Sequence, residues 1–169
     1  MEFGEKNVNN DPLVGRGKSI FPPLNIKLSL MKLFVKALDK DGSYFAYIGK
    51  KMPRLSAEKI KAGIFDSPQI RHLIKDFAFV KSMNESERKA CTSFCAVVES
   101  FLDKRKAENY VELVNEILNS FKSLGCNMSI KVRYLHNHLD RFPENLRDTS
   151  EEQGERFHQN IKTMEESYQ

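Results

Sequence analysis

Apolar residues near the start of the chain recur at the spacing of an α-helix. After Phe21-Pro22-Pro23 they follow one another at steps of four, three, four and three, at Leu24, Leu28, Met31, Val35 and Leu38. This spacing places the side chains on one face of a helix, and Pro23 suits the first helical turn. The pattern predicts an amphipathic helix that begins at Pro23 and ends before a turn at residues 39–42.

Three shorter helices are predicted next. The segment from Tyr44 to Lys50 precedes Pro53, and a helix capped by Ser56 is expected to run to about Phe65. Ser67-Pro68 predicts a new start, with the Ser67 hydroxyl as the cap and the proline in the first turn.

Two longer helices follow, and they are expected to pack antiparallel. Asn84 and Glu87 form a capping arrangement for a helix that extends to about Lys104. Its apolar positions are Cys91, Phe94, Cys95, Val98, Phe101 and Leu102. The second helix carries Tyr110, Val114, Ile117, Leu118 and Phe121 on one side. It is expected to end at Gly125, a residue suited to the left-handed conformation.

The last part of the chain is also predicted to be helical. One helix is expected from Met128 to Arg141, ended by Pro143, and Ser150 with Gln153 forms a capping box that opens a final helix. The buried side of that final helix carries Phe157, Ile161, Met164 and Tyr168. Since no segment alternates apolar and polar residues long enough for a strand, we expect an all-α fold, an irregular bundle of about six to eight helices.

Composition is that of one ordinary globular domain. The chain has 169 residues, of which 40% are hydrophobic and 30% charged, which excludes a disordered, collagen-like or coiled-coil protein. We expect residues 1–21 to form an extended or disordered arm and residues 22–169 a single helical domain. No segment has the apolar length of a membrane span and no secretory signal is present, so the expected location is intracellular, in the nucleus or the cytoplasm.

Candidate reactive residues are few. The three cysteines, Cys91, Cys95 and Cys126, form no Cys-x-x-Cys pair and are expected to be core residues. No phosphate-binding loop, dinucleotide fingerprint, nucleophile elbow or zincin motif occurs in the sequence. Potential metal ligands gather in the last fifth of the chain, at His136, His138, Asp140, Glu152, Glu155 and His158.

Within that group, Glu155 and His158 have the spacing of a shared metal site. On a helix they lie about 60° apart and can address one point. Glu155 lies about 160° round the helix from Phe157, so it points away from the apolar stripe, as a solvated acidic residue or as a ligand for something outside the helix. His138 and Asp140 are weaker candidates, because a histidine beside Leu135 is also the expected pattern of a structural core residue.

Charge is unevenly distributed. The net charge is +4, but residues 1–80 contain 14 basic and 8 acidic side chains, whereas residues 81–169 contain 13 and 15. Lys27, Lys32, Lys36, Lys40, Lys50, Lys51, Arg54, Lys59 and Lys61 form a basic stretch with Phe45 and Tyr47 interleaved. The candidates for nucleic-acid binding are Lys32, Lys36, Lys50, Lys51 and Arg54; the alternative role of such lysines is solubility.

Several ordered blocks of residues resemble one known family. They are Pro22-Pro23-Leu24-Asn25-Ile26-Lys27-Leu28, Gly63-Ile64-Phe65 with Pro68-Gln69-Ile70-Arg71, Ala107-Glu108-Asn109-Tyr110, Gly125-Cys126-Asn127-Met128-Ser129, and Phe142-Pro143-Glu144-Asn145 with Glu152 to Gln159. Together they resemble transposon-derived proteins of invertebrate genomes, some of them captured by bracoviruses. Longer members are similar to DDE-type transposases of the RNase H-like superfamily, and this chain resembles their part after the second catalytic Asp.

The resemblance implies roles for individual residues. Residues 22–147 match the helical insertion, residues 148–169 match the final helix, and Glu155 matches the third acidic residue of the metal-binding triad, followed by His158. An active full-length nuclease of this kind uses Mg²⁺ or Mn²⁺ held by two or more carboxylates. The upstream Asp positions have no counterpart here, and Asn25 stands where relatives usually carry His.

The resemblance therefore predicts a truncated, transposase-like relic that is catalytically inactive alone, binds no cofactor and retains nucleic-acid binding. Two alternatives remain: a helical protein-interaction module or non-functional relic, and a part of a longer metal-dependent DNA nuclease in which Met1 is not the true start. The expected partners are DNA, an RNase H-like core or another protein on an exposed helical face, and no membrane.

Overall fold

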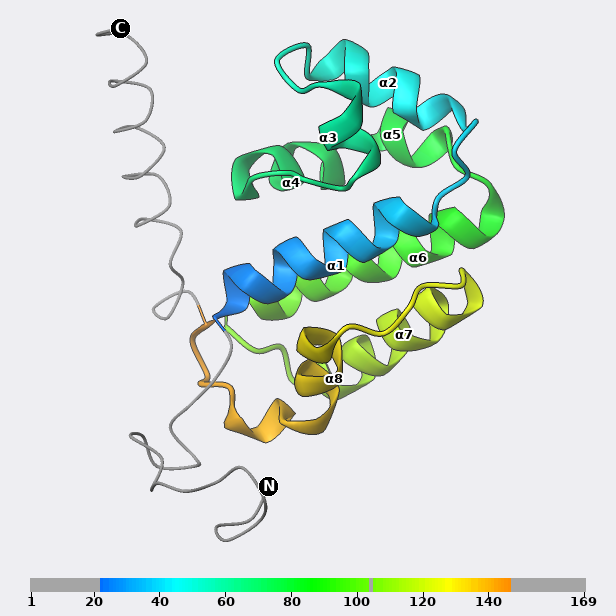
Figure 1. Ribbon diagram of the computed structural model, residues 1–169. Coiled ribbons are helices and arrows are strands. Elements are labelled where there is room, and N and C mark those ends of the chain that lie inside the picture. The colour runs from blue at the N-terminus through cyan, green and yellow to red at the C-terminus, as the bar shows by residue number, and fades with distance from the viewer. Residues whose placement is uncertain (1–21, 104, 147–169) are drawn as a thin grey trace, which may run out of the picture.

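A computed structural model describes residues 22–103 and 105–146, which form a bundle of helices (Figure 1). The α-helices are α1 Pro23–Ala37, α2 Ser43–Lys51, α3 Ala57–Lys61, α4 Ser67–Ile74, α5 Phe77–Lys81, α6 Glu85–Val97, α7 Tyr110–Ser123 and α8 Ile130–Asn137. A π-helical turn, Val98–Leu102, extends α6, and a 3₁₀ turn, Leu139–Arg141, follows α8. Since the described residues contain no strand, only one isolated bridge between Arg105 and Asn145, the all-α prediction is confirmed.

Helix α1 lies in the middle of the bundle. Figure 1 shows α2 to α5 on one side of it and α7 and α8 on the other, with α6 running alongside. Its buried surface is therefore wider than the stripe expected from sequence, because Ile26, Leu30 and Phe34 are also fully buried. The Phe34 ring stacks on Phe94 of α6 at 6.3 Å and on Phe121 of α7 at 6.1 Å between ring centroids.

Helices α6 and α7 pack antiparallel, as predicted (Figure 1). Two small polar residues meet in their interface, where the Ser93 and Ser120 hydroxyl oxygens lie 2.6 Å apart in a hydrogen bond. Gly125 ends this segment with a φ of 82°, the left-handed conformation expected of it. Among the cysteines Cys91 is buried, whereas Cys95 and Cys126 are only partly buried, and all three are free thiols.

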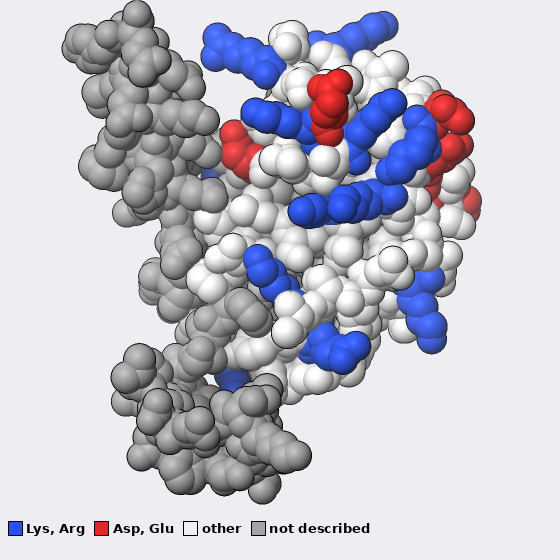
Figure 2. Space-filling model, in the orientation of Figure 1, with Lys and Arg blue, Asp and Glu red and all other residues white. Residues whose placement is uncertain are grey.

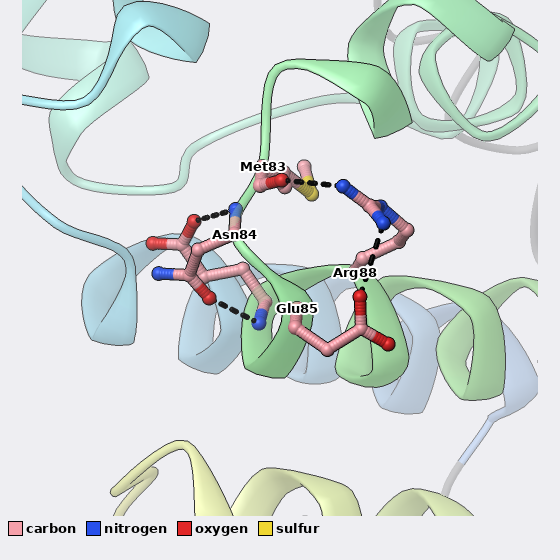
Figure 3. A network of polar contacts seen from close by, with 5 residues as sticks. Met83, Asn84, Glu85 and Arg88 are labelled. Atoms are coloured by element: carbon pink, nitrogen blue, oxygen red, sulfur yellow. Dashed lines mark hydrogen bonds and ion pairs between the residues drawn. The ribbon is translucent and has the colours of Figure 1, made fainter.

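The predicted start of α6 is confirmed in atomic detail (Figure 3). The Asn84 side chain accepts a hydrogen bond from the Glu87 amide, and the Glu87 carboxylate accepts one from the Asn84 amide, each at 3.0 Å. Arg88 donates to Glu85 at 3.0 Å and to the Met83 carbonyl at 3.1 Å. This capping box satisfies two amides that the first turn of a helix otherwise leaves without an acceptor.

Two predicted helix boundaries were wrong. The cap of α4 is Asp66 and not Ser67. The Asp66 carboxylate accepts from the Gln69 backbone amide at 2.7 Å, and the Gln69 side-chain oxygen accepts from the Asp66 backbone amide at 3.0 Å. Helix α3 is capped by Ser56 as predicted but ends at Lys61, short of Phe65. The reason is Gly63, whose φ of 68° turns the chain out of the helix.

Two further segments differ from the sequence prediction. Helix α5 was not predicted; Asp76 begins it by accepting from the Ala78 amide at 3.1 Å. The expected helix from Met128 to Arg141 is shorter and interrupted, because Ser129 caps α8 and the chain leaves the helical conformation at His138. The arm at residues 1–21 and the final helix expected from Ser150 lie outside the described residues.

Candidate nucleic-acid interface

The candidate metal ligands do not meet in the part of the chain that the structure describes. Glu155 and His158 lie outside it. Asp140 is exposed in the 3₁₀ turn. His138 is half-buried, and its ring packs against the Tyr134 ring with 4.6 Å between centroids. His136 is exposed beside Asn137. No group of three or more His, Cys, Asp or Glu residues is positioned to hold a metal ion within residues 22–103 and 105–146.

Positive charge gathers over α1 to α5. Between residues 22 and 83, ten Lys or Arg side chains are exposed and only three acidic ones, Asp39, Asp41 and Glu58. We call the ten the basic surface: Lys32, Lys36, Lys40, Lys50, Lys51, Arg54, Lys59, Lys61, Lys75 and Lys81. Figure 2 shows basic side chains clustered over the part of the molecule formed by α2, α3 and α4, and further ones below it.

The remaining described surface has no such excess. Between residues 84 and 146, leaving out residue 104, six exposed side chains are basic and seven are acidic. The charge asymmetry seen in the sequence is therefore an asymmetry of the folded surface. All five predicted nucleic-acid contacts, Lys32, Lys36, Lys50, Lys51 and Arg54, are exposed on the positive part.

Lys27 does not belong to this surface, although the sequence placed it in the same basic stretch. Its side chain is fully buried, and its ammonium nitrogen lies 2.7 Å from Asp103 Oδ1. A side chain with its charge held by a carboxylate inside the bundle has a structural role. The sequence pattern did not predict this burial, because Lys27 lies next to Leu28 but is not itself one of the apolar positions of the predicted helix.

Lys51 is exposed, but its positive charge is paired with the carboxylate of Asp76. Its ammonium lies 3.1 Å from Asp76 Oδ2, and the same oxygen accepts a hydrogen bond of 2.6 Å from the Tyr47 hydroxyl. The bond from Tyr47 is the largest cause that lowers the pKa of Asp76, and Lys51 lowers it further. In turn the hydrogen bond with Asp76 raises the pKa of both Tyr47 and Lys51. This cluster joins the end of α2 to the start of α5.

The two interleaved aromatic residues are engaged within the protein. Phe45 is half-buried, with its ring 4.8 Å from the Tyr44 ring and the Lys40 ammonium 5.6 Å from its centroid. Tyr47 packs against Phe79 at 6.5 Å in addition to its bond with Asp76. Neither ring is presented as an open stacking surface for a nucleic-acid base.

Sequence reasoning missed Phe77, because it missed α5. Its side chain is 70% exposed, and the Lys81 ammonium lies 4.7 Å from its ring centroid. The available signal was Asp76 before Phe77-Ala78-Phe79-Val80, a capping residue followed by a short apolar run. Only Phe79 of this pair of rings enters the core, at 1% exposure.

Comparison with known protein families gives a match to the first part of the described chain. Residues 23–103, from the start of α1 to the residue after the π-helical turn, match a family described as a domain of unknown function (DUF8704). No curated protein and no solved structure matches the chain significantly. Among the described residues, none of the helices combines the length and apolar character needed to cross a membrane.

Proposed function

We propose that this chain binds nucleic acid through the basic surface of α1 to α5. The observation that carries the proposal is the contrast between ten exposed basic and three exposed acidic side chains on residues 22–83 and the balanced surface of the rest of the described chain. Lysine and arginine side chains that neutralise phosphates release condensed counterions, so this kind of surface supplies affinity without reading sequence.

The strongest contribution is expected from lysines whose charge is least compensated. Lys32 and Lys36 lie one helical turn apart on the exposed side of α1, with Lys40 following in the turn after it. Residues four apart in a helix project from the same face. Lys51 is expected to contribute less, because Asp76 already balances its charge at 3.1 Å.

A charge-reversal experiment tests the proposal. Binding of a fluorescent 20-nucleotide oligomer and of a duplex is measured by anisotropy at several salt concentrations, for the wild type and for Lys32→Glu/Lys36→Glu. The slope of log affinity against log salt concentration is negative, and removing two phosphate contacts is expected to reduce its magnitude by about 2. The matched control is Lys122→Glu/Arg133→Glu, which reverses two exposed charges on α7 and α8. Equal affinity for both double variants would refute the proposal.

We also propose that the chain descends from a transposase-like protein and does not cleave DNA by itself. The support is the resemblance of the residue blocks from Pro22 to Gln159 together with the helical architecture of residues 22–103 and 105–146. Two-metal phosphodiester cleavage needs several converging carboxylates, and the resemblance supplies only Glu155. Supercoiled plasmid is expected to stay intact with the chain and Mg²⁺ or Mn²⁺. Nicking that Glu155→Gln abolishes would instead favour the nuclease alternative.

A further inference from the structure

Phe77 is the most exposed aromatic side chain among the described residues, and its backbone is held firmly. Asp76, the residue before Phe77, caps α5, and its carbonyl accepts a hydrogen bond of 3.1 Å from the Phe79 amide. The side chain of Phe79, two residues after Phe77, is buried. The cluster of Tyr47, Asp76 and Lys51 ties the same point to α2. The contacts of Asp76 and Phe79 thus fix the backbone on both sides of Phe77, while its apolar ring remains exposed.

The surroundings of Phe77 are cationic. Lys81 lies one turn further along α5, with its ammonium 4.7 Å from the ring centroid, and Lys75 is exposed two residues before Phe77. The nearest acidic side chain in sequence, Asp76, is ion-paired with Lys51. An exposed ring flanked by lysines combines the two elements that bind single-stranded nucleic acid: a surface for base stacking and positive charge for the adjacent phosphates.

We infer that Phe77 stacks on an unpaired base, with Lys75 and Lys81 contacting the flanking phosphates. This inference rests on the proposed function and names its substrate class, single-stranded nucleic acid or a strand with unpaired bases. Bases inside a duplex are already stacked on their neighbours, so the ring adds affinity only where a base is unpaired. The other aromatic residues of the basic surface, Phe45 and Tyr47, are engaged in internal contacts and do not take this role.

The first test compares Phe77→Ala with the wild type on a single strand and on a duplex. One base stacked on an aromatic ring contributes about 1–3 kcal/mol, so affinity for a 20-nucleotide oligo(dT) is expected to fall about 5- to 140-fold. Affinity for a duplex of the same length is expected to stay within about 2-fold, since phosphate contacts remain. Ile130→Ala is the matched control, because Ile130 begins α8, on the other side of α1 from α5 (Figure 1), and its side chain is 75% exposed.

A second test reads the contact directly. The chain contains no tryptophan and five tyrosines, so Phe77→Trp places a single tryptophan at the proposed stacking site, and its emission can be excited selectively over that of the tyrosines. Oligo(dT) is expected to quench its emission, and Ile130→Trp is expected to give no quenching. Quenching of both, or of neither, overturns the inference even if a variant has altered stability, because the signal does not depend on comparing affinities.

The outcomes separate this inference from the proposed function. If Lys32→Glu/Lys36→Glu weakens binding while Phe77→Ala binds oligo(dT) like the wild type, the stacking inference is wrong and the basic surface stands. If neither variant changes binding, or if the wild type binds no oligomer in a salt-dependent way, both fail.

Discussion

Lys27 of α1 and Asp103, the residue after the π-helical turn, form an ion pair of 2.7 Å in which the lysine is completely buried and the carboxylate keeps 20% of its side-chain surface exposed. The two residues are 76 positions apart in the chain. The pair therefore fixes the N-terminal half of α1 against the end of the α6 segment, and with it the position of the helix that carries Lys32 and Lys36.

The unequal burial of the pair predicts unequal effects of substitution. Asp103→Asn replaces the carboxylate 2.7 Å from a fully buried ammonium by a neutral amide, and we expect a loss of about 3 kcal/mol in the free energy of unfolding. Lys27→Met leaves the partly hydrated Asp103 and fills the space with an apolar chain, so we expect about 1 kcal/mol. Urea denaturation measures both. A greater loss for Lys27→Met than for Asp103→Asn would contradict this account.

Gly63 predicts a second stability effect at α1. Its φ is 68°, and a Cβ there would lie 2.8 Å from the Lys32 Cα atom. Gly63→Ala therefore combines a left-handed backbone penalty with a backbone clash, and we expect a loss of about 3 kcal/mol by urea denaturation.

Two other glycines serve as matched controls for Gly63→Ala. Gly125 has a φ of 82° but no atom within 4 Å of its would-be Cβ, so Gly125→Ala should cost only the conformational part, about 1 kcal/mol. Gly49 is inside α2 and also has open space, so Gly49→Ala should stabilise the protein by about 0.5 kcal/mol. Equal losses at Gly63 and Gly125 would show that the contact with α1 does not matter.

Much of the fold could be predicted from local signals. The apolar spacing of α1, the capping box at Asn84 and Glu87, and the Gly125 stop all identify features that the structure contains. Each depends on residues within a few positions of one another. Helix α5 and the cap at Asp66 were missed because the helices are short, and neighbouring Ser67 offered a competing hydroxyl.

The candidate site could be predicted only in part. Exposure of Lys32, Lys36, Lys50, Lys51 and Arg54 follows from helix periodicity and from turn position. The burial of Lys27 does not, because it depends on Asp103, far away in the sequence. The same holds for Lys51 and Tyr47, whose partner Asp76 belongs to another helix.

The cluster of Tyr47 and Asp76 predicts a pH dependence of stability. Because the pKa of Asp76 is lower in the folded chain than its usual value of 3.8, its contribution to stability is complete above about pH 4 and is lost as the pH falls through the folded value. Tyr47→Phe removes the main cause of this lowering. The difference in unfolding free energy between wild type and Tyr47→Phe should therefore be largest at neutral pH and shrink between about pH 4 and pH 2.

Urea denaturation across that range measures the difference, with Tyr110→Phe as control. Tyr110 begins α7, on the other side of α1 from α2 and α5 (Figure 1), and packs on Phe101 with 5.7 Å between ring centroids. Its variant should therefore keep a constant offset from the wild type in acid. A constant offset for Tyr47→Phe as well would show that the hydrogen bond to Asp76 does not shift its titration.

Glu87 is a buried carboxylate that joins three elements. One oxygen accepts from the Asn84 amide at 3.0 Å and the other from the Asp39 amide at 3.1 Å, with the Tyr44 hydroxyl 3.5 Å away. Burial is the main cause that raises the pKa of Tyr44, and the charge of Glu87 is the next. The Tyr44 hydroxyl donates to the Asp39 carbonyl, so α6, the turn after α1 and α2 meet at this carboxylate.

Replacing Glu87 therefore tests how α1 and α2, which carry part of the basic surface, are attached to α6. Glu87→Gln replaces one of the two accepting oxygens by an NH2 donor that faces a backbone N–H, and we expect a loss of about 2 kcal/mol in unfolding free energy. Glu87→Ala removes both acceptors and should cost about 3 kcal/mol. Glu85→Gln is the control, because Glu85 is 88% exposed and only pairs with Arg88, so a change below about 0.5 kcal/mol is expected. If Glu87→Gln were as mild as Glu85→Gln, the carboxylate would be a cap of α6 alone and the contact with Asp39 would contribute nothing.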